Sequence, residues 1–337
     1  MGSFIAWRGH ALMPPTVKAV FAKKGFDEVH ELQIGEYHLA YAEKQLLKSP
    51  CVHQEASFSL LLMGTAIIPP LPAEDSLKTL VAQYKTEGKI ETSSLLGNYL
   101  IVLFHADGVQ FYTDEANGYS LYFHQHGIWS DSQLAMVHAL HSFGEPTSWA
   151  HDALNINLSI GFLYGEKTIF KDVYRFDTAL HALANEWKYI TNVRAEEERM
   201  AAPQDAAQAI ALQKDTLRGI FKALTPALRT GGAWCGLTAG LDSRLLALCA
   251  HTMAPDVEVK AFTNTQSPHS IQVKIAEQIA RALNCDFTVN LHEGVCADID
   301  SNLYFNDGML RIYQIWLEES KSRASAKNRF AAASAVL

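Results

Sequence analysis

The chain has 337 residues, of which 48% are hydrophobic and 19% are charged, and its formal net charge is −8 at pH 7. At roughly 150 residues per domain, this length predicts two domains, each with enough apolar residues to bury a core. The negative charge argues against a general affinity for nucleic acid or for anionic membranes, because both attract basic surfaces.

Five cysteines are scattered along the chain, and none are spaced as in a CxxC motif. This odd number and spacing favour reduced thiols over a disulfide framework or a zinc site. The first residues, MGSFIAWRGHALMPP, lack the basic and long apolar segments of a secretory signal, and no apolar run is long enough to cross a bilayer. We therefore expect a cytoplasmic protein without a membrane partner.

Up to about residue 190 the sequence pattern predicts mostly short strands. Aromatic and branched residues predict strands in SFSLLLMGTAII (57–68), YLIVLFH (99–105), VQFYTDE (109–115) and SLYFHQ (120–125). An Asp-Gly pair at 107–108 and an Asn-Gly pair at 117–118 are hairpin signals, because both turn residues can adopt positive φ. With helices expected at 72–86 and 131–143, the pattern predicts an antiparallel sheet with helices packed against it.

The second half has a different pattern. The stretch VRAEEERMAAPQDAAQ (193–208) is charged and then alanine-rich, and we interpret it as the linker between the domains. Beyond it, helices carrying one apolar face alternate with strands. The predicted helices are a long one containing Ile210 to Leu228, one at about 243–253 and one from Ile271 to Leu283, and the predicted strands are AWCGL (233–237), VEVKAFTN (257–264) and DFTVNL (286–291). This alternation predicts parallel pairing with right-handed crossovers.

The stretch GLTAGLDSRLLAL (236–248) puts a turn of small residues where ligands of parallel sheets bind, at the carboxyl end of a strand. Small side chains at Ala239 and Gly240 let backbone N–H groups approach an anion, and the start of the next helix adds partial positive charge. Thr238 and Ser243 supply hydroxyl donors. Asp242 would repel a bare phosphate, which suggests a bridging Mg²⁺.

The alternative for this turn is a plain strand–helix junction in which Asp242 or Ser243 is the N-cap. The turn lacks the GK[ST] of a Walker loop and is not GxGxxG, so by itself it leaves both interpretations open. Elsewhere, the HQH segment at 124–126 places two imidazoles on one face of a predicted strand. Exposed or cross-strand histidines are favoured there over a metal site. Asp107 and Asp114 favour turns over an acid–base pair.

Four segments resemble one family. LTAGLDSR is similar to the SGGxDS pyrophosphate-binding loop of the asparagine synthetase family, within the wider group of ATP pyrophosphatases, and FTNTQSPHSIQVKIAEQIARALN resembles that family's second strand and following helix. LLGNYLIVLFHADGVQFYTDEANGYSLYFH resembles the family's glutaminase-type domain, and GFLYGEKTIFKDVYRF resembles the stretch that closes it. The likeness covers most of residues 55–300 and rests on the order and spacing of these segments.

The resemblance implies a two-domain α/β protein. Residues 1–195 would form a degenerate class II glutamine amidotransferase-like domain, an N-terminal-nucleophile (Ntn) α/β/β/α sandwich of antiparallel sheets. Residues 205–337 would form an incomplete asparagine synthase-type ATP-binding domain, a HUP-like α/β/α layer structure around a parallel sheet.

The resemblance also implies an AMP-forming ligase with ATP and Mg²⁺ as cofactors. Family members attack the α-phosphate with a substrate carboxylate, and an amine then displaces AMP from the acyl-adenylate. The expected partners are a small-molecule or peptide carboxylate and an amine acceptor, with a homodimer as a further expectation and no catalytic residue assigned. The implied nucleotide-binding residues are Leu237, Thr238, Ala239, Gly240, Leu241, Asp242, Ser243 and Thr263, with Mg²⁺ held near Asp242 through the phosphates.

The chain departs from the family at its first domain. Active glutaminase domains begin with Met-Cys, whereas this sequence begins Met1-Gly2-Ser3, and Gly2 has no nucleophile. The strand that would carry the family's glutamine-binding asparagine reads MGTAIIPP. We therefore expect no glutamine hydrolysis, as in the β-lactam synthetases and lasso-peptide cyclases, whose first domains are degenerate. A glutamine hydrolase would require a processed Ser3.

Two further departures concern the synthetase domain. In the loop, Thr238 replaces serine and Ala239 replaces glycine. The printed sequence ends at AAASAVL, about where the family's GEGADE-like motif is expected, which implies either a fragment or the loss of later catalytic groups. The alternative to a ligase is a catalytically inactive nucleotide-binding or interaction protein derived from the family.

Overall fold

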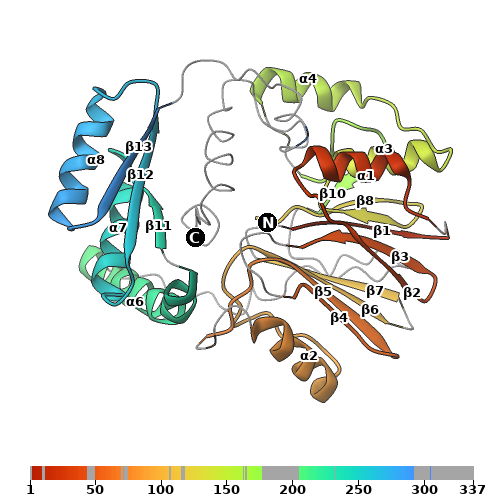
Figure 1. Ribbon diagram of the computed structural model, residues 1–337, viewed down its shortest axis with the longest axis horizontal. Helices are drawn as coiled ribbons and strands as arrows, with labels where there is room; N and C mark the ends of the chain where they lie inside the picture. Colours follow the sequence, from red (N-terminus) through yellow and green to blue (C-terminus); the bar gives the residue numbers. More distant parts are fainter. Residues whose placement is uncertain are drawn as a thin grey trace.

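The computed structural model describes residues 2–9, 12–43, 50–69, 71, 75–105, 108–114, 118–161, 163, 165–176, 205–231, 233–291 and 304. Two antiparallel sheets gather in one lobe and a three-stranded parallel sheet lies in another (Figure 1). The prediction of a mixed α/β protein with antiparallel sheets followed by a parallel sheet is confirmed. The boundary between the predicted domains, 195–205, falls almost entirely outside the described residues.

Ten strands of the described residues build the antiparallel lobe. They are β1 (Ser3–Arg8), β2 (His30–Ile34), β3 (Tyr37–Ala42), β4 (Val52–Gln54), β5 (Phe58–Gly64), β6 (Tyr99–His105), β7 (Gly108–Thr113), β8 (Tyr122–His124), β9 (Ile128–Ser130) and β10 (Val173–Arg175). One sheet has the order β10-β8-β9-β1-β3-β2 and the other the order β4-β5-β6-β7.

Both sheets are covered on both faces, which explains why their central strands are almost wholly apolar. Along β6, Leu100, Val102 and Phe104 belong to the core between the two sheets, whereas Ile101 and Leu103 belong to the core under a helix. That helix is α2 (Ser76–Glu87). The helices α1 (Pro15–Lys23) and α3 (Gln133–Ser142) cover the outer face of the six-stranded sheet. The order of layers is therefore helix, sheet, sheet, helix, with α4 (His151–Ile160) at the edge of the lobe (Figure 1).

Of the two predicted turns, one is a hairpin and the other is not. Strands β6 and β7 pair through His105 and Gly108, as the Asp-Gly signal predicts. The Asn-Gly prediction at 117–118 is wrong, because β7 and β8 belong to different sheets. The carboxylate of buried Asp114 accepts hydrogen bonds from the amides of Gly118 (3.0 Å) and Tyr119 (3.3 Å). These bonds fix the chain between the end of one sheet and the start of the other. Asp114 is thus a turn residue, as predicted.

Six elements of the described residues form the second lobe. They are α6 (Ala206–Gly231), β11 (Ala233–Gly236), α7 (Leu241–Met253), β12 (Val259–Thr265), α8 (Ile271–Ala282) and β13 (Asp286–Leu291). The strands lie in the order β11-β12-β13 and pair in parallel, as predicted.

The end of the predicted linker is helical. Helix α6 begins at Ala206, and the carboxylate of Asp205 accepts a hydrogen bond from the amide of Gln208 (2.8 Å). The alanines at 206, 207 and 209 favour a helix over a linker. Residues 193–204 lie outside the described part of the chain.

The core of the second lobe joins one face of the parallel sheet to small side chains of α7 and α8. Cys235 and Ala261 of the sheet are buried together with Ala250 and Ala276 of the helices. Burial raises the pKa of Cys235 to about 11, which keeps it a thiol. The described cysteines, Cys51, Cys235, Cys249 and Cys285, form no disulfide with one another. Among the described helices, none combines the length and apolar character needed to span a membrane.

Candidate functional site

The turn between β11 and α7 lies at the carboxyl edge of the parallel sheet. The amide of Leu237 donates to the carbonyl of Phe262 (2.7 Å), so pairing continues one residue beyond β11 before the chain turns. Gly240 is the N-cap of α7, with extended backbone (φ −71°, ψ 151°). The predicted position of the turn is confirmed, but the alternative that made Asp242 or Ser243 the N-cap is wrong.

Hydroxyl groups bond within the turn. The Oγ of Ser243 accepts a hydrogen bond from the amide of Thr238 (3.1 Å) and lies 3.0 Å from the Oγ1 of Thr238. The amide of Gly240 donates to the same Oγ1 (3.0 Å). A phosphate could therefore reach these two amides only by taking over the bonds that the hydroxyls now make.

The backbone of the turn is ordinary. Ala239 and Gly240 do not have positive φ, so alanine in place of the family's glycine causes no backbone strain at 239. At Gly240, an added Cβ would lie 3.2 Å from the Oγ1 of Thr238. The guanidinium of Arg244 donates to the carbonyl of Ala239 and brings a positive charge against the turn.

The remaining residues that the resemblance implies in nucleotide binding differ in their exposure to solvent. Asp242, in the first turn of α7, and Leu241 are exposed, whereas Leu237 and Thr263 are buried. Leu237 belongs to the core, so its contact with any ligand would be through its backbone. Phosphate oxygens accept hydrogen bonds from hydroxyls and amides, and Mg²⁺ takes carboxylate oxygens as ligands. In this respect the residues of the turn fit the expected cofactors.

An amide pair that was not predicted from the sequence lies at the same edge. The side-chain nitrogen of Asn290 donates to the side-chain oxygen of Asn264 (3.0 Å), and these residues are register partners on β13 and β12. Each strand carries its asparagine near its carboxyl end, which was the available signal. Their amides add hydrogen-bonding groups beside the turn.

A second polar cluster lies at the start of β1, where the resemblance would place a nucleophile. Gly2 is buried, and an added Cβ would come 2.6 Å from the carbonyl oxygen of Ala42 and 2.9 Å from the Cε of Met63. The hydroxyl of Ser3 is buried and donates to Asp131 Oδ1 (2.8 Å). The structure therefore leaves little room for a side chain at position 2.

Burial favours the protonated form of Asp131. The hydroxyl of Tyr119 has two acceptors in reach, the carbonyl of Gly2 (2.8 Å) and Asp131 Oδ2 (2.7 Å). A protonated Asp131 would be able to donate to the Tyr119 oxygen while Tyr119 donates to Gly2. Burial raises the pKa of Asp131, outweighing the Lys24 charge and the hydrogen bonds from Phe4, Tyr119 and Ser3.

We expect Asp131→Asn to be nearly neutral at about pH 8, within about 1 kcal/mol, because its amide can donate to Tyr119 as the protonated acid does. Asp131→Ala removes the side chain that hydrogen-bonds the Ser3 hydroxyl, the Phe4 amide and the Tyr119 hydroxyl. It should lower the free energy of unfolding by about 3 kcal/mol. Because the folded pKa is raised, the carboxyl group stabilises the fold least at high pH. Urea unfolding should therefore show wild type losing stability relative to Asp131→Asn as pH rises from about 4 through the folded pKa. Equal destabilisation by both variants would contradict a protonated Asp131.

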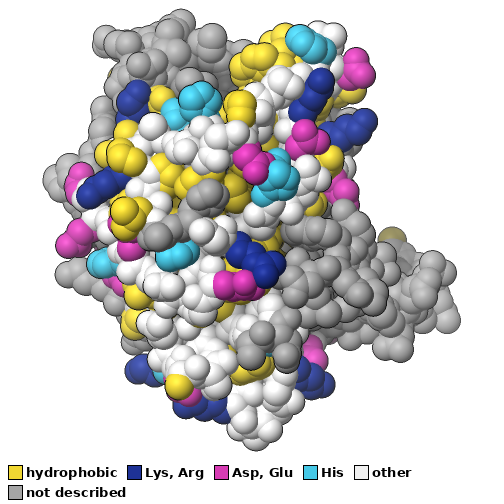
Figure 2. All heavy atoms as spheres, turned by 90° about the vertical axis from the view of Figure 1, so that its right-hand side faces the viewer, with side chains coloured by type: hydrophobic (Ala, Val, Ile, Leu, Met, Phe, Trp, Pro, Cys, Tyr) yellow, Lys and Arg dark blue, Asp and Glu magenta, His cyan; other side chains and the backbone are white. Residues whose placement is uncertain are grey.

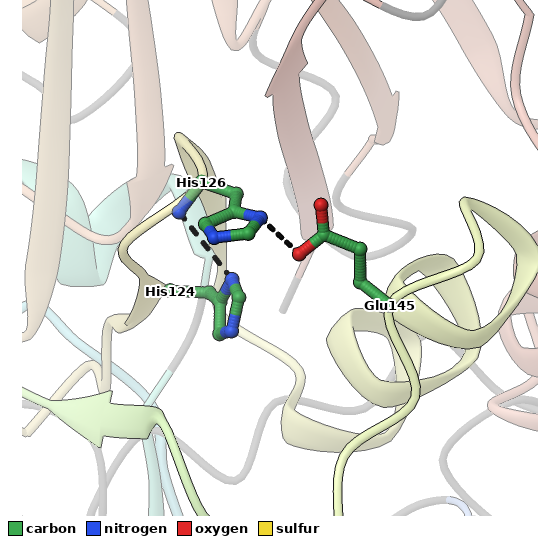
Figure 3. Close-up of side chains that lie close together, drawn as sticks. All are labelled: His124, His126 and Glu145. Atoms are coloured by element: carbon green, nitrogen blue, oxygen red, sulfur yellow. Dashed lines mark hydrogen bonds and ion pairs between the residues drawn. The ribbon is translucent and has the colours of Figure 1, made fainter.

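The third cluster joins two histidines and a glutamate (Figure 3). His124 ends β8 and is buried, whereas His126 lies in the following turn and Glu145 follows α3, both exposed. The Nδ1 of His126 contacts the carboxylate of Glu145 as an ion pair, and the two imidazole centroids are 4.9 Å apart. Burial, helped by the neighbouring His126, lowers the pKa of His124 and favours its neutral form.

This cluster corrects the sequence interpretation of 124–126. The strand ends at His124, so the two imidazoles do not share one face of a strand. The turn after the strand brings them together instead. Glu145 was not predicted as part of the cluster, because nothing local in the sequence links it to the histidines.

The surface of the antiparallel lobe has mixed charge. On the face drawn in Figure 2, basic and acidic side chains of the described residues are interspersed, and neither sign forms a continuous patch. That face thus offers no extended basic surface.

Comparison with models of known protein families gives no match to the chain, and none of the curated proteins matches its sequence.

Proposed function

We propose that the chain is an asparagine synthetase-like, AMP-forming ligase that activates a carboxylate with ATP and Mg²⁺ and transfers it to an amine without hydrolysing glutamine. The observation that carries the proposal is the Thr238–Ser243 turn. It stands at the carboxyl edge of a parallel sheet and leads directly into α7. An α/β/β/α Ntn sandwich and a HUP-like nucleotide domain are the finer folds that the observed layers support.

In this proposal the turn holds the polyphosphate of ATP. The hydroxyls of Thr238 and Ser243 would give up their mutual contact to bind phosphate oxygens, and the amides around Gly240 would then be able to donate to the phosphate as well. Arg244 adds positive charge beside the turn. The exposed Asp242 would help to hold Mg²⁺, which would neutralise phosphate charge.

ATP, when bound, supplies the adenylyl group that activates the carboxylate. The chain contributes by positioning and by neutralising charge on the departing pyrophosphate. Asn264 and Asn290 offer amides at the same edge for the rest of the nucleotide or for the substrate. Leu237, directly after β11, and Thr263, within β12, are the residues that the resemblance puts near the adenosine.

The start of β1 supports the absence of glutamine hydrolysis from the proposed activity. Position 2 has no room for a side chain without movement of Ala42 or Met63. The Ser3 hydroxyl is engaged by Asp131, and Asp131 in its protonated form is a poor base. The amine would therefore come from a second substrate.

The second candidate is a nucleotide-binding or interaction protein without catalysis. The inward hydrogen bonds between Thr238 and Ser243 favour it, because they already satisfy donors that a catalytic loop would direct at phosphate.

The two candidates are separated by ATP–pyrophosphate exchange with a panel of carboxylates, alongside calorimetry of ATP binding with Mg²⁺. Carboxylate-dependent exchange is expected for the ligase. ATP binding without exchange for any carboxylate favours the second candidate, and absence of ATP binding overturns both.

A further inference from the structure

The cluster of His124, His126 and Glu145 has the composition of a transition-metal site. One potential ligand atom from each residue lies within 4.8 Å of the other two. Two imidazole nitrogens and one carboxylate oxygen suit Zn²⁺, Ni²⁺ or Cu²⁺, whereas Mg²⁺ and Ca²⁺ prefer oxygen ligands alone. The set thus differs in chemistry from the proposed magnesium site near Asp242.

The backbone holds the two histidines in a fixed turn. The amide of Gly127 donates to the carbonyl of His124 (3.0 Å) and closes the turn that contains His126. Gly127 has φ +74°, a conformation that suits glycine. His124 is also held by pairing with Val173 on one side and Ile128 on the other. The buried histidine is therefore a rigid base for the site.

Glu145 is also fixed by its backbone. The chain leaves α3 through Gly144 (φ +81°), and the amide of Glu145 donates to the carbonyl of Leu140 (2.9 Å). This bond anchors the residue to the last turn of the helix, while its carboxylate reaches back to His126 (Figure 3). Three ligands from two separate elements thus converge with little freedom in their main chains, as a preorganised site requires.

The side chains need only small movements to bind an ion. Zinc bonds of about 2.0–2.2 Å place tetrahedral ligands roughly 3.4 Å apart, closer than the present limit of 4.8 Å. His126 and Glu145 are exposed and can rotate, whereas His124 is buried. The ion would replace the direct contact between His126 and Glu145 and would leave a coordination position open to water.

We propose that His124, His126 and Glu145 form a binding site for a divalent transition-metal ion, with Zn²⁺ as its representative. The ion links the β8–β9 turn to the end of α3. The site lies in the antiparallel lobe and is independent of the proposed nucleotide chemistry.

The test is calorimetric titration of the tag-free, EDTA-treated full chain with ZnCl₂. We expect one site that His126→Ala and Glu145→Gln each weaken by at least about tenfold. His151→Ala, an exposed histidine at the start of α4, is the matched control and should bind zinc as wild type does. His124→Ala is avoided as the primary variant, because His124 is buried and its loss threatens the fold.

A second measurement identifies the ligands directly. X-ray absorption at the zinc edge of the loaded protein should show two imidazoles and one carboxylate, and circular dichroism should show that the variants are folded. No saturable zinc binding, or binding that both variants retain unchanged, would overturn the proposal. Zinc coordinated by sulfur would overturn it as well.

Discussion

Gly64→Ala should lower the free energy of unfolding by about 4 kcal/mol, the largest effect that we expect from adding one methyl group. Gly64 ends β5 with φ +75°, which alanine adopts only under strain. The added Cβ would also lie 2.3 Å from the carbonyl oxygen of Asn98 and 2.8 Å from the Tyr119 ring. The backbone at 98 cannot retreat easily, because its carbonyl accepts the amide of Thr65.

Gly88→Ala is the matched control for this prediction. Gly88 has nearly the same φ (+68°) at the end of α2, but nothing lies within 4 Å of its added Cβ. The control should therefore cost only the backbone strain, about 1 kcal/mol. Urea unfolding of both variants measures the difference. Equal losses at the two positions would show that contact with Asn98 and Tyr119 contributes nothing.

Asp242→Asn should reduce magnesium-dependent ATP–pyrophosphate exchange by about 100-fold. The Asp242 side chain is exposed in the first turn of α7, so the substitution should not disturb the fold. The substitution replaces the carboxylate that we assign as an Mg²⁺ ligand with a neutral amide. If the protein binds ATP without exchange, the same variant should instead weaken ATP binding in magnesium and have little effect without it.

Asp286→Asn provides the matched control. Asp286 is exposed and begins β13, so the same change of charge occurs at the opposite, amino edge of the parallel sheet. Its exchange rate should remain at the wild-type level. Equal loss in the two variants would point to net charge rather than to a local site, and an unaffected Asp242→Asn would remove that residue from the proposal.

Local patterns predicted the second lobe well. DFTVNL was expected as a strand and forms β13 with the same bounds, and the turn beginning at Thr238 lies at the carboxyl edge where the alternation of strands and helices put it. These features depend on periodicity within a short segment. The direction of the hydroxyls of Thr238 and Ser243 was not predictable, because it depends on which of several nearby acceptors each group finds.

The antiparallel lobe shows where local patterns fail. The Asn-Gly pair at 117–118 has the composition of a hairpin, but β7 and β8 belong to different sheets, and Asp114 accepts the amides of Gly118 and Tyr119 between them. Turn propensity describes two residues, whereas sheet membership depends on which strands bury each other's faces.

The sequence by itself determined the alternation of strands and helices in the second lobe, the change from antiparallel to parallel pairing and the place of the turn at Thr238, since periodicity and turn composition are local properties. The tertiary structure alone decided the crowding around Gly2, the burial of Asp131 against Tyr119 and the meeting of His126 with Glu145. Each of these depends on packing between segments distant in the chain. The distances and burial that create such a site exist only after the layers have come together.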